Sequence, residues 1–495
     1  GFARDMLLAN VLGAGMVADA FFVAFKFPNF FRRLFAEGAF NAGFVPLFAG
    51  RLTTDGRDAA LRFASEVAAV MMTALVIFSI AVILAMPWLM HAIAPGFADD
   101  PVKFDMTVEL TRVTFPYLLF MALIALMGGM LNSLERFSAT AAAPIFLNIV
   151  LITVLLLAQA DVFPVPGYAL AWGVAGAGLG QFVWIAWACK RAGVLPALPR
   201  PRLTPGVKRL FVLMVPALIG AGVVQINLVV DVILASTLRE GSVSFLYYAD
   251  RVNQLPLGVV GVAVGIVLLP MLVRQLRSGE DQAAQYSQNR AIEFALTLTV
   301  PAAAALIAIA GPIVTVLFQR GVFDAVAAEA TADALMAFAV GLPAYVLIKA
   351  LTPGFYARED TKTPVKIAVA AVAVNIVLAV SLMQVLDHVG IALATALAAW
   401  MNAGLLGLIL IRRDHLTLDA RLRNRIPRLV LASAVLGGGL YGAAAYLQVW
   451  FTGGELERIA ALVLLVAGGG VVFVGLAAAT GAVRLGDLRE MVSRK

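Results

Sequence analysis

Residues 1–46, GFARDMLLANVLGAGMVADAFFVAFKFPNFFRRLFAEGAFNAGFVP, place charged side chains inside long apolar stretches. Six of the 37 Lys and Arg residues of the chain lie inside such stretches rather than in the polar breaks between them: Arg4, Lys26, Arg32, Arg33, Arg251 and Lys349. A cation in hydrocarbon costs several kcal/mol, so such residues normally face a water-filled cavity or a partner of opposite charge. The pattern predicts a polytopic membrane protein with a cationic interior and an anionic substrate.

The composition of the whole chain also indicates a membrane protein. Of its 495 residues 62% are hydrophobic and only 14% are charged, and the mean hydropathy is +0.93. Apolar runs of about 20 residues, long enough to cross a hydrocarbon core of about 30 Å as helices, recur along the chain. They predict an all-α fold with about 14 transmembrane helices, at residues 1–14, 17–50, 62–91, 106–134, 139–160, 166–189, 207–238, 243–273, 286–318, 328–356, 363–386, 389–412, 427–450 and 457–483.

The cations outside the apolar stretches are distributed unevenly among the polar breaks. Most of them lie in alternate breaks, and the other breaks hold only Lys103, Arg112, Arg239, Arg320 and Arg458. Because cytoplasmic loops of membrane proteins are enriched in Lys and Arg, the pattern predicts a cytoplasmic N-terminus. The net charge of +7 is then a signal of topology, dispersed over short loops, and does not indicate nucleic-acid binding.

Two polar landmarks recur along the chain at a constant spacing. Pro116 and Asn148 are followed 227 residues later by Pro343 and Asn375. An offset of about six helices makes the two copies parallel, related by a pseudo-two-fold axis along the membrane normal. We therefore predict two six-helix lobes and an appended C-terminal helix pair, at residues 1–200, 201–425 and 426–495. Chance similarity between apolar helices is the alternative explanation.

Polar residues inside the predicted helices gather first in residues 1–46. Pro28 removes a helical hydrogen bond, so the second span is expected to be bent or broken, as at the substrate sites of transporters. Arg32 and Arg33 lie about 100° apart on a helix, so one is expected to line a cavity while the other pairs with Glu37. The candidate substrate ligands here are Arg4, Asp5, Lys26, Asn29, Arg32 and Arg33, and the candidate gating or ion-pair residues are Asp19 and Glu37. A structural ion-pair network is the alternative for this set.

A second group of polar residues lies in SVSFLYYADRVNQLPLGVVGVAVG, residues 242–265. The guanidinium of Arg251 suits a phosphate, which it can bind through two parallel N–H donors. A salt bridge with Asp250 is the alternative. Lys349 is a further candidate for a gating residue or ion pair, and its long stem can also reach a membrane interface.

Asp231 is a lone carboxylate in the middle of a predicted span. With Asn375 and Thr395 it is a candidate site for Na⁺ or a proton, and a hydrogen-bonded structural role is the alternative. No other cofactor is expected, because the three histidines are isolated and no metal-binding spacing or glycine-rich phosphate loop occurs.

Several segments together resemble one family of membrane transporters. Residues 1–49, together with APGF, FPYLLF, LNSLERFS, YYADR and PGFYAREDTKTPVKIA, are similar to the MurJ/MviN lipid II flippases of the multidrug/oligosaccharidyl-lipid/polysaccharide exporter superfamily. The resemblance covers nearly the whole chain. It implies fourteen helices in two lobes, an appended helix pair that forms a hydrophobic groove, and alternating access. Because Gly1 falls inside the first motif, we expect the first helix to be truncated.

The resemblance also assigns roles to individual residues. Arg4, Arg32 and Arg251 match the cavity arginines of the family, and Asp5 matches the acid of its first helix. Some members hold a sodium ion in the second lobe, at positions that Asp231, Asn375 and Thr395 resemble in part. Two departures concern carboxylates: Gln254 stands where some members have Glu, and the acid expected one turn after Asn375 is absent.

The expected function is translocation of lipid II, an undecaprenyl diphosphate-linked disaccharide-pentapeptide, from the inner to the outer leaflet of the bacterial cytoplasmic membrane. The expected driving force is the membrane potential, Na⁺ or H⁺. The alternatives are an exporter of another anionic polyprenyl-linked saccharide or of a drug, a polyprenyl-phosphate enzyme, and a scaffold in a cell-wall synthesis complex. The expected partners are lipid II, the phospholipid membrane and such a complex, and we expect a transporter rather than an enzyme.

Overall fold

The computed structural model describes residues 1–34 and 40–482, apart from the side chains at 217, 219–221, 223, 224, 262–264 and 266. The described residues form helices and no strand, so the predicted all-helical class is confirmed. By their internal contacts the helices form two compact units, Gly1–Ser244 and Phe245–Lys495.

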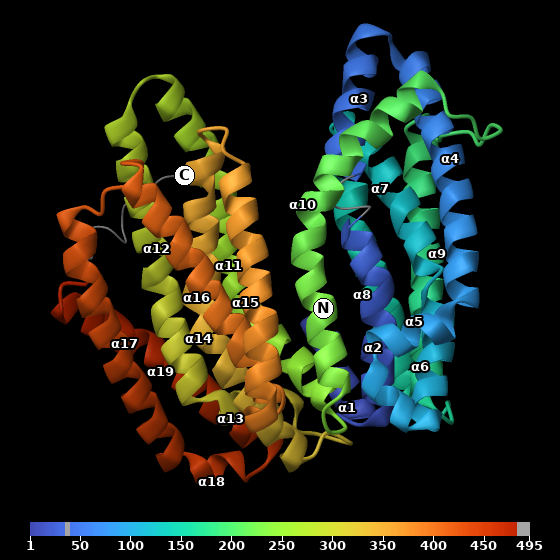
Figure 1. The fold of residues 1–495 in the computed structure, drawn as a ribbon. Coiled ribbons are helices and arrows are strands. Elements are labelled where there is room, and N and C mark those ends of the chain that lie inside the picture. Colours follow the sequence, from blue (N-terminus) through green and yellow to red (C-terminus); the bar gives the residue numbers. More distant parts are fainter. Residues whose placement is uncertain (35–39, 483–495) are drawn as a thin grey trace. The chain divides into compact units, whose positions relative to one another are not determined.

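The first unit contains helices of very different length (Figure 1). The shortest ones lie at residues 86–93 and 95–99. Its elements are α1 (Phe2–Leu12), α2 (Met16–Phe31), α3 (Asn41–Thr54), α4 (Arg57–Leu84), α5 (Met86–Ile93), η2 (Pro95–Asp99), α6 (Pro101–Thr114), α7 (Tyr117–Ser133), α8 (Ser138–Gln159), α9 (Pro166–Arg191) and α10 (Pro205–Ser236).

The second unit consists mainly of long helices (Figure 1). The last of them, α17 and α19, pack against each other, α17 also packs against α12, and α19 also packs against α13. Its elements are α11 (Ser242–Arg277, whose first residues belong to the first unit), α12 (Asp281–Ala308), α13 (Ala310–Phe318), α14 (Ala325–Tyr356), α15 (Lys362–Leu386), α16 (His388–Arg412), α17 (Ala420–Tyr446), α18 (Gln448–Phe451) and α19 (Glu455–Ala479).

Ten stretches of the described helices are long and apolar enough to cross a membrane. They coincide with ten of the predicted spans, and the predicted spans 1–14, 17–50, 207–238 and 243–273 are not among them. The apolar stretch of α19 has only 11% of its residues buried, whereas those of Pro101–Ser133 and Ala325–Tyr356 are 67% and 61% buried. An apolar helix with so little protein cover is expected to face lipid, so these proportions support the membrane class.

Pro28, where the sequence predicts a bent or broken span, lies inside α2 and does not end it. α2 continues through Pro28 to Phe31, and α3 begins at Asn41. Proline has no N–H to donate to the carbonyl four residues earlier, which is that of Ala24. Thr114 Oγ1 on α6 donates to this carbonyl instead, at 2.8 Å. The neighbouring helix thus satisfies the carbonyl that Pro28 leaves without its helical partner.

The last helix of the first unit, α10, packs against α3, α4, α5 and η2. The closest approach is at Gly96, where an added Cβ would lie 2.2 Å from the carbonyl oxygen of Ser236. By these contacts α10 packs within the first unit. The glycine of the APGF motif allows this packing because it has no side chain.

Candidate functional site

Arg4 and Asp5 form a buried ion pair on α1. Arg4 donates from Nε and Nη2 to Asp5 Oδ1, at 3.0 and 2.7 Å. Its guanidinium carbon lies 5.9 Å from the ring centre of Phe25 on α2. Asp5 therefore holds the plane of the guanidinium and compensates its charge within the first unit.

The second half of α2 carries a polar stripe. Lys26, Asn29 and Arg32 follow each other at intervals of three residues, so they lie along one side of the helix. Asn29 accepts a hydrogen bond from Arg32 Nε at 2.9 Å, and it donates from Nδ2 to the carbonyl of Phe25 at 2.7 Å. The residues of α2 before Lys26 are mostly buried, whereas the three members of the stripe are half-buried and Arg33 is exposed. The stripe is therefore the part of α2 whose polar atoms reach the surface of the first unit.

Asp19, in the first turn of α2, is surrounded by donors from distant parts of the first unit. Its Oδ2 accepts from Lys103 Nζ on α6 and from the backbone N–H of Gly241, both at 2.8 Å. Its Oδ1 accepts from the backbone N–H and the hydroxyl of Ser244, at 3.0 and 2.6 Å. Nearby, Glu240 accepts from the backbone N–H of Met16 at 2.6 Å. Asp19 is 1% exposed, so this carboxylate joins α2, α6 and the first residues of α11 with the turn before it in a buried polar cluster.

In the second unit, Arg251 lies on α11 beside aromatic side chains of its own motif. Its guanidinium carbon is 4.7 Å from the ring centre of Tyr247, a cation–π distance. The next residue, Tyr248, is completely buried, with its ring 5.1 and 5.2 Å from the rings of Phe318 and Phe323. The two tyrosines of YYADR therefore anchor this turn of α11 and orient Arg251, which is itself half-buried.

Asp250 and Lys349, two further candidate residues, also have defined neighbours in the second unit. Asp250 accepts a hydrogen bond from Gln254, one turn further along α11. The substitution of Gln for an acid at 254 therefore provides a neutral donor to Asp250. Lys349, on α14, is exposed, and its amine lies against Gly261 of α11, where an added Cβ would be 2.6 Å from Nζ.

The remaining predicted residues lie on several different elements or outside the described residues. Glu37, the predicted partner of Arg33, lies outside the described residues. Asp231 lies on α10 in the first unit, whereas Asn375 and Thr395 lie on α15 and α16 in the second. Among the described residues no group of three or more His, Cys, Asp or Glu side chains could hold a metal ion. The sodium site stays a prediction.

Two features of the structure were missed by sequence reasoning. Lys103 was counted as a loop cation, but it is 7% exposed and bonded to Asp19. Glu293 on α12 forms ion pairs with Arg290, Arg421 and Arg425. The only sequence signal for this cluster was the density of arginines at the start of α17, which the positive-inside rule already explained.

The fold and these residues define a polytopic helical membrane protein with cationic side chains at the polar helices of both units. The chain belongs to the family described as "Lipid II flippase MurJ", whose model matches residues 8–461, so the resemblance seen in the sequence is confirmed. It is 49% identical over 500 residues to a probable lipid II flippase MurJ of Rhizobium meliloti (strain 1021), covering 100% of this chain and 93% of the relative. It is 36% identical over 448 residues to the lipid II flippase MurJ of Burkholderia cenocepacia, covering 90% and 87%.

Two solved structures have the same fold as this chain. One is a lipid II flippase MurJ in an inward closed conformation, with a TM-score of 0.78 and 23% identity over 96% of this chain and 95% of the other. The other is a multidrug resistance MATE family transporter in an inward-facing conformation, with a TM-score of 0.71 and 14% identity over 83% and 93%. The fold is thus shared by transporters with different named substrates, and it does not by itself identify the substrate.

Proposed function

We propose that this chain is a lipid II flippase, which moves the lipid-linked peptidoglycan precursor from the inner to the outer leaflet of the bacterial cytoplasmic membrane by alternating access. The observation that carries the proposal is the family match over residues 8–461, supported by 49% identity along the whole chain to a probable lipid II flippase. In this proposal the chain is a transporter and not an enzyme.

The proposed architecture has fourteen transmembrane helices, a cytoplasmic N-terminus and two lobes related by a pseudo-two-fold axis. Support for the repeat comes from the helix order, because α4, α5, α6 and α8 begin 224 residues before α12, α13, α14 and α15 respectively. A repeat of an even number of helices keeps both copies in the same orientation. The lobes are proposed at residues 1–200 and 201–425, followed by the C-terminal pair at 426–495.

The substrate chemistry explains why arginines are needed. Moving the headgroup of lipid II through hydrocarbon would strip water from two charged phosphates, at a cost of many kcal/mol. Arginine side chains can replace this water with charge-assisted hydrogen bonds while the polyprenyl tail remains in lipid. We assign this role to Arg4, Arg32 and Arg251, with Lys26 and Arg33 as further cationic ligands.

The local contacts suggest how these arginines are held for binding. Asp5 occupies Nε and Nη2 of Arg4, which fixes the orientation of Nη1. Asn29 accepts from Nε of Arg32, and the ring of Tyr247 supports the guanidinium of Arg251. A guanidinium that is already oriented loses less side-chain entropy when it binds a phosphate.

The energy for transport is proposed to come from the membrane potential. With a negative cell interior, outward movement of a net-negative headgroup is favoured by about 2.3 kcal/mol per charge per 100 mV. Coupling to Na⁺ through Asp231, Asn375 and Thr395, or to H⁺, is a second proposal. Replacing Na⁺ by choline at constant potential would separate Na⁺ coupling from the membrane potential and from H⁺ coupling, because only Na⁺ coupling makes the transport rate depend on this exchange.

The experiment that tests the function is depletion of the protein in its bacterial host, followed by measurement of lipid II in each leaflet. A flippase predicts accumulation in the inner leaflet, whereas an enzyme predicts failed synthesis and a scaffold predicts neither. In reconstituted vesicles, Arg251→Ala is expected to reduce lipid II transport at least tenfold, and Arg200→Ala, in the exposed α9–α10 connection, serves as the control. Normal transport by Arg251→Ala would contradict the proposed site, and no transport of lipid II by the native chain would contradict the function.

A further inference from the structure

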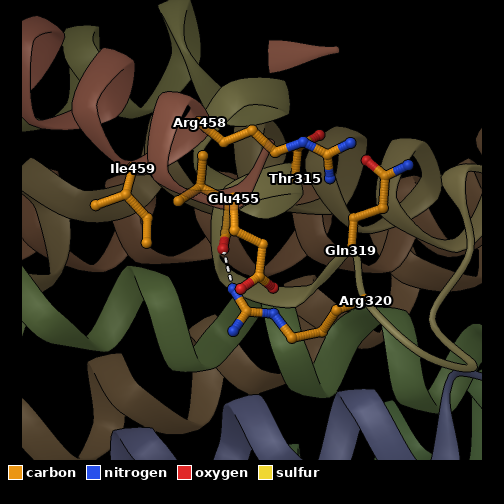
Figure 2. A pocket seen from close by; sticks show the side chains of 7 residues that line it. Thr315, Gln319, Arg320, Glu455, Arg458 and Ile459 are labelled. Atoms are coloured by element: carbon orange, nitrogen blue, oxygen red, sulfur yellow. Dashed lines mark hydrogen bonds between the residues drawn. The ribbon is translucent and has the colours of Figure 1, made fainter. Parts of the chain in front are cut away.

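A small polar pocket lies in the second unit, where the end of α13 meets the beginning of α19. It is lined by Thr315, Val316, Gln319, Arg320, Glu455, Arg458 and Ile459. Figure 2 shows Arg320 and Arg458 at this pocket, reaching it from the two different helix ends, together with Glu455. None of these residues belongs to the proposed substrate ligands.

The two arginines retain donors that the protein does not use. Arg320 donates from Nη2 to the carbonyl of Val316, and Arg458 donates from Nε to the carbonyl of Gly453 at 3.1 Å. Arg320 Nε is buried and has no hydrogen-bond partner among the described residues. A guanidinium carries five N–H donors, so each side chain can donate to a further acceptor in the pocket. A buried donor without a partner is costly, which favours an acceptor bound at this position.

The charge of the pocket favours an anion. Its lining contains two guanidinium groups and one carboxylate, that of Glu455. In the described part of the chain no ion pair joins Glu455 to Arg320 or to Arg458. Glu455 is also the first residue of the 25-residue helix α19, whose N-terminus carries a partial positive charge.

The surroundings of the pocket indicate a membrane interface. α17 ends at Tyr446, which is 88% exposed, and Trp450 of α18 is 46% exposed. Exposed Tyr and Trp at the ends of apolar helices are typical of the level of lipid headgroups. The arginine-rich segment at the start of α17 is separated from this end by the whole length of that helix, so the positive-inside rule places the pocket in the outer leaflet.

The pocket is small and polar, so its lining is suited to a single compact charged group at the surface of the second unit. We propose that Arg320 and Arg458 form a binding site for the phosphate group of a membrane lipid in the outer leaflet. Arginine donors suit phosphate oxygens, and the apolar surface of α19 beside the pocket is suited to an acyl or prenyl chain.

A purely structural role is the alternative for Arg320, because basic residues often cap the last carbonyls of a helix, as this one caps α13. Capping uses only Nη2 of Arg320 and requires neither Arg458 nor a net positive pocket. The two explanations therefore differ in the effect of Glu455. If the pocket binds phosphate, removing the charge of Glu455 strengthens this binding. If Arg320 is only a helix cap, removing the charge of Glu455 has no effect, because this carboxylate does not contact the cap.

The test measures lipid binding to the full-length protein in detergent by native mass spectrometry, with phosphatidylglycerol as the probe and phosphatidylcholine as the neutral control. Arg320→Gln/Arg458→Gln is expected to weaken phosphatidylglycerol binding at least tenfold, and Glu455→Gln to strengthen it a few-fold. Arg200→Gln removes one positive charge elsewhere and is expected to leave binding unchanged. Thermal unfolding of each variant identifies any loss of fold. If the double variant is unfolded, the single variant Arg458→Gln, which leaves the cap of α13 intact, is compared with the native chain instead.

Two further arms identify the source of the phosphate. An undecaprenyl diphosphate lipid is measured in the same way. If the double variant loses binding of this lipid but not of phosphatidylglycerol, the site is supported and is assigned to the polyprenyl lipid rather than to phospholipid. Inorganic phosphate is expected to compete only weakly, because it lacks the lipid chain. Unchanged phosphatidylglycerol and undecaprenyl diphosphate binding in the double variant would overturn the proposal, and so would binding of inorganic phosphate alone.

Discussion

The carboxylates of Asp19 and Glu293 are both surrounded by donors, but the donors differ. Asp19, in the first unit, receives one ammonium, two backbone N–H groups and one hydroxyl, and it is 1% exposed. Glu293, in the second unit, receives three guanidinium groups. The side chain of one of these, Arg421, is 37% exposed.

The difference indicates that the two buried carboxylates have different structural roles. At Asp19 the charges balance one to one in a buried place, and the neutral donors come from residues more than 220 positions away. At Glu293 the cations exceed the acids, and the cluster lies where α12 meets the start of α17. Buried pairs are screened little by salt, whereas exposed pairs are screened strongly. We infer that the first cluster determines how distant segments pack, and that the second mainly attaches the C-terminal helix pair to α12.

The largest effect is expected from Asp19→Asn. The substitution leaves the buried ammonium of Lys103 without its counter-charge, which is expected to cost about 3–5 kcal/mol. The measurement is the free energy of unfolding in detergent. The double variant Asp19→Asn/Lys103→Met removes both charges and is expected to recover part of the loss. A change of less than about 0.5 kcal/mol in the single variant would show that the cluster is not important for stability.

The next largest effect is expected from Gly96→Ala, which tests the close packing of η2 against α10 in the same unit as the Asp19 cluster. In Gly96→Ala the new Cβ would lie 2.2 Å from the carbonyl oxygen of Ser236, so η2 and α10 must move apart. Overpacking of this kind is expected to cost about 1–3 kcal/mol. Gly442→Ala, on α17, is the matched control, because nothing lies within 4 Å of its added Cβ. If both variants unfold at the temperature of the native chain, the close approach at Gly96 is not a constraint.

Glu293→Gln tests the second cluster. Its three arginines lose their shared carboxylate, and the expected loss is about 1–3 kcal/mol at low salt. Because the cluster is partly exposed, the difference from the native chain is expected to shrink when NaCl is raised from about 0.1 M to about 1 M. The same titration on Asp19→Asn is expected to show no such reduction. Equal salt dependence in the two variants would remove the distinction between the clusters.

The smallest effect concerns pH and lies near the second cluster, in the connection between α16 and α17. Burial, with the positive charges of Arg358 and Arg413, lowers the pKa of His415 below its ordinary value of 6.5. The neutral form therefore stabilises the fold, fully above pH 6.5, and this contribution is lost as the pH falls below 6.5. We expect His415→Gln to lose less stability than the native chain when thermal unfolding is compared at pH 8 and pH 5. Parallel curves would contradict this assignment.

Asp360 provides an internal contrast for the same measurement. Hydrogen bonds from Thr363 and the guanidinium of Arg413 lower its pKa from 3.8 to about 2. Its stabilising contribution is therefore present above pH 3.8 and is lost only as the pH falls towards 2. Between pH 8 and pH 5 it is constant, so Asp360→Asn is expected to shift the whole curve without changing its slope.

The sequence predicted individual helices well where a span is uniformly apolar. The predicted spans 139–160 and 363–386 match α8 and α15 to within one residue at each end. Prediction was weakest where the sequence is polar, in residues 17–50. There, the carbonyl of Ala24 that Pro28 leaves without its helical partner is satisfied by the hydroxyl of Thr114, 90 residues after Ala24, which no local pattern contains.

The same limit applies to the candidate site. Arg4, Arg32 and Arg251 could be identified from the sequence because each lies within a long apolar segment. The cost of placing a cation in hydrocarbon can be inferred from that segment alone. The sequence did not reveal that Asp5 is the partner of Arg4 or that Lys103 is buried against Asp19. Which charges meet depends on how the helices pack, and the segments that supply the donors of Asp19 are up to 225 residues away along the chain.

By itself, the sequence determined that this chain is a helical membrane protein of the flippase family and where most of its helices lie. These properties follow from hydropathy, length and motif, which are all local along the chain. Only the tertiary structure decided that Asp19 binds Lys103 and Ser244, that Thr114 supports α2 at Pro28, and that Arg320 and Arg458 share a pocket. The physical reason is that hydrogen bonds and ion pairs act over a few ångströms, between residues that packing alone brings together.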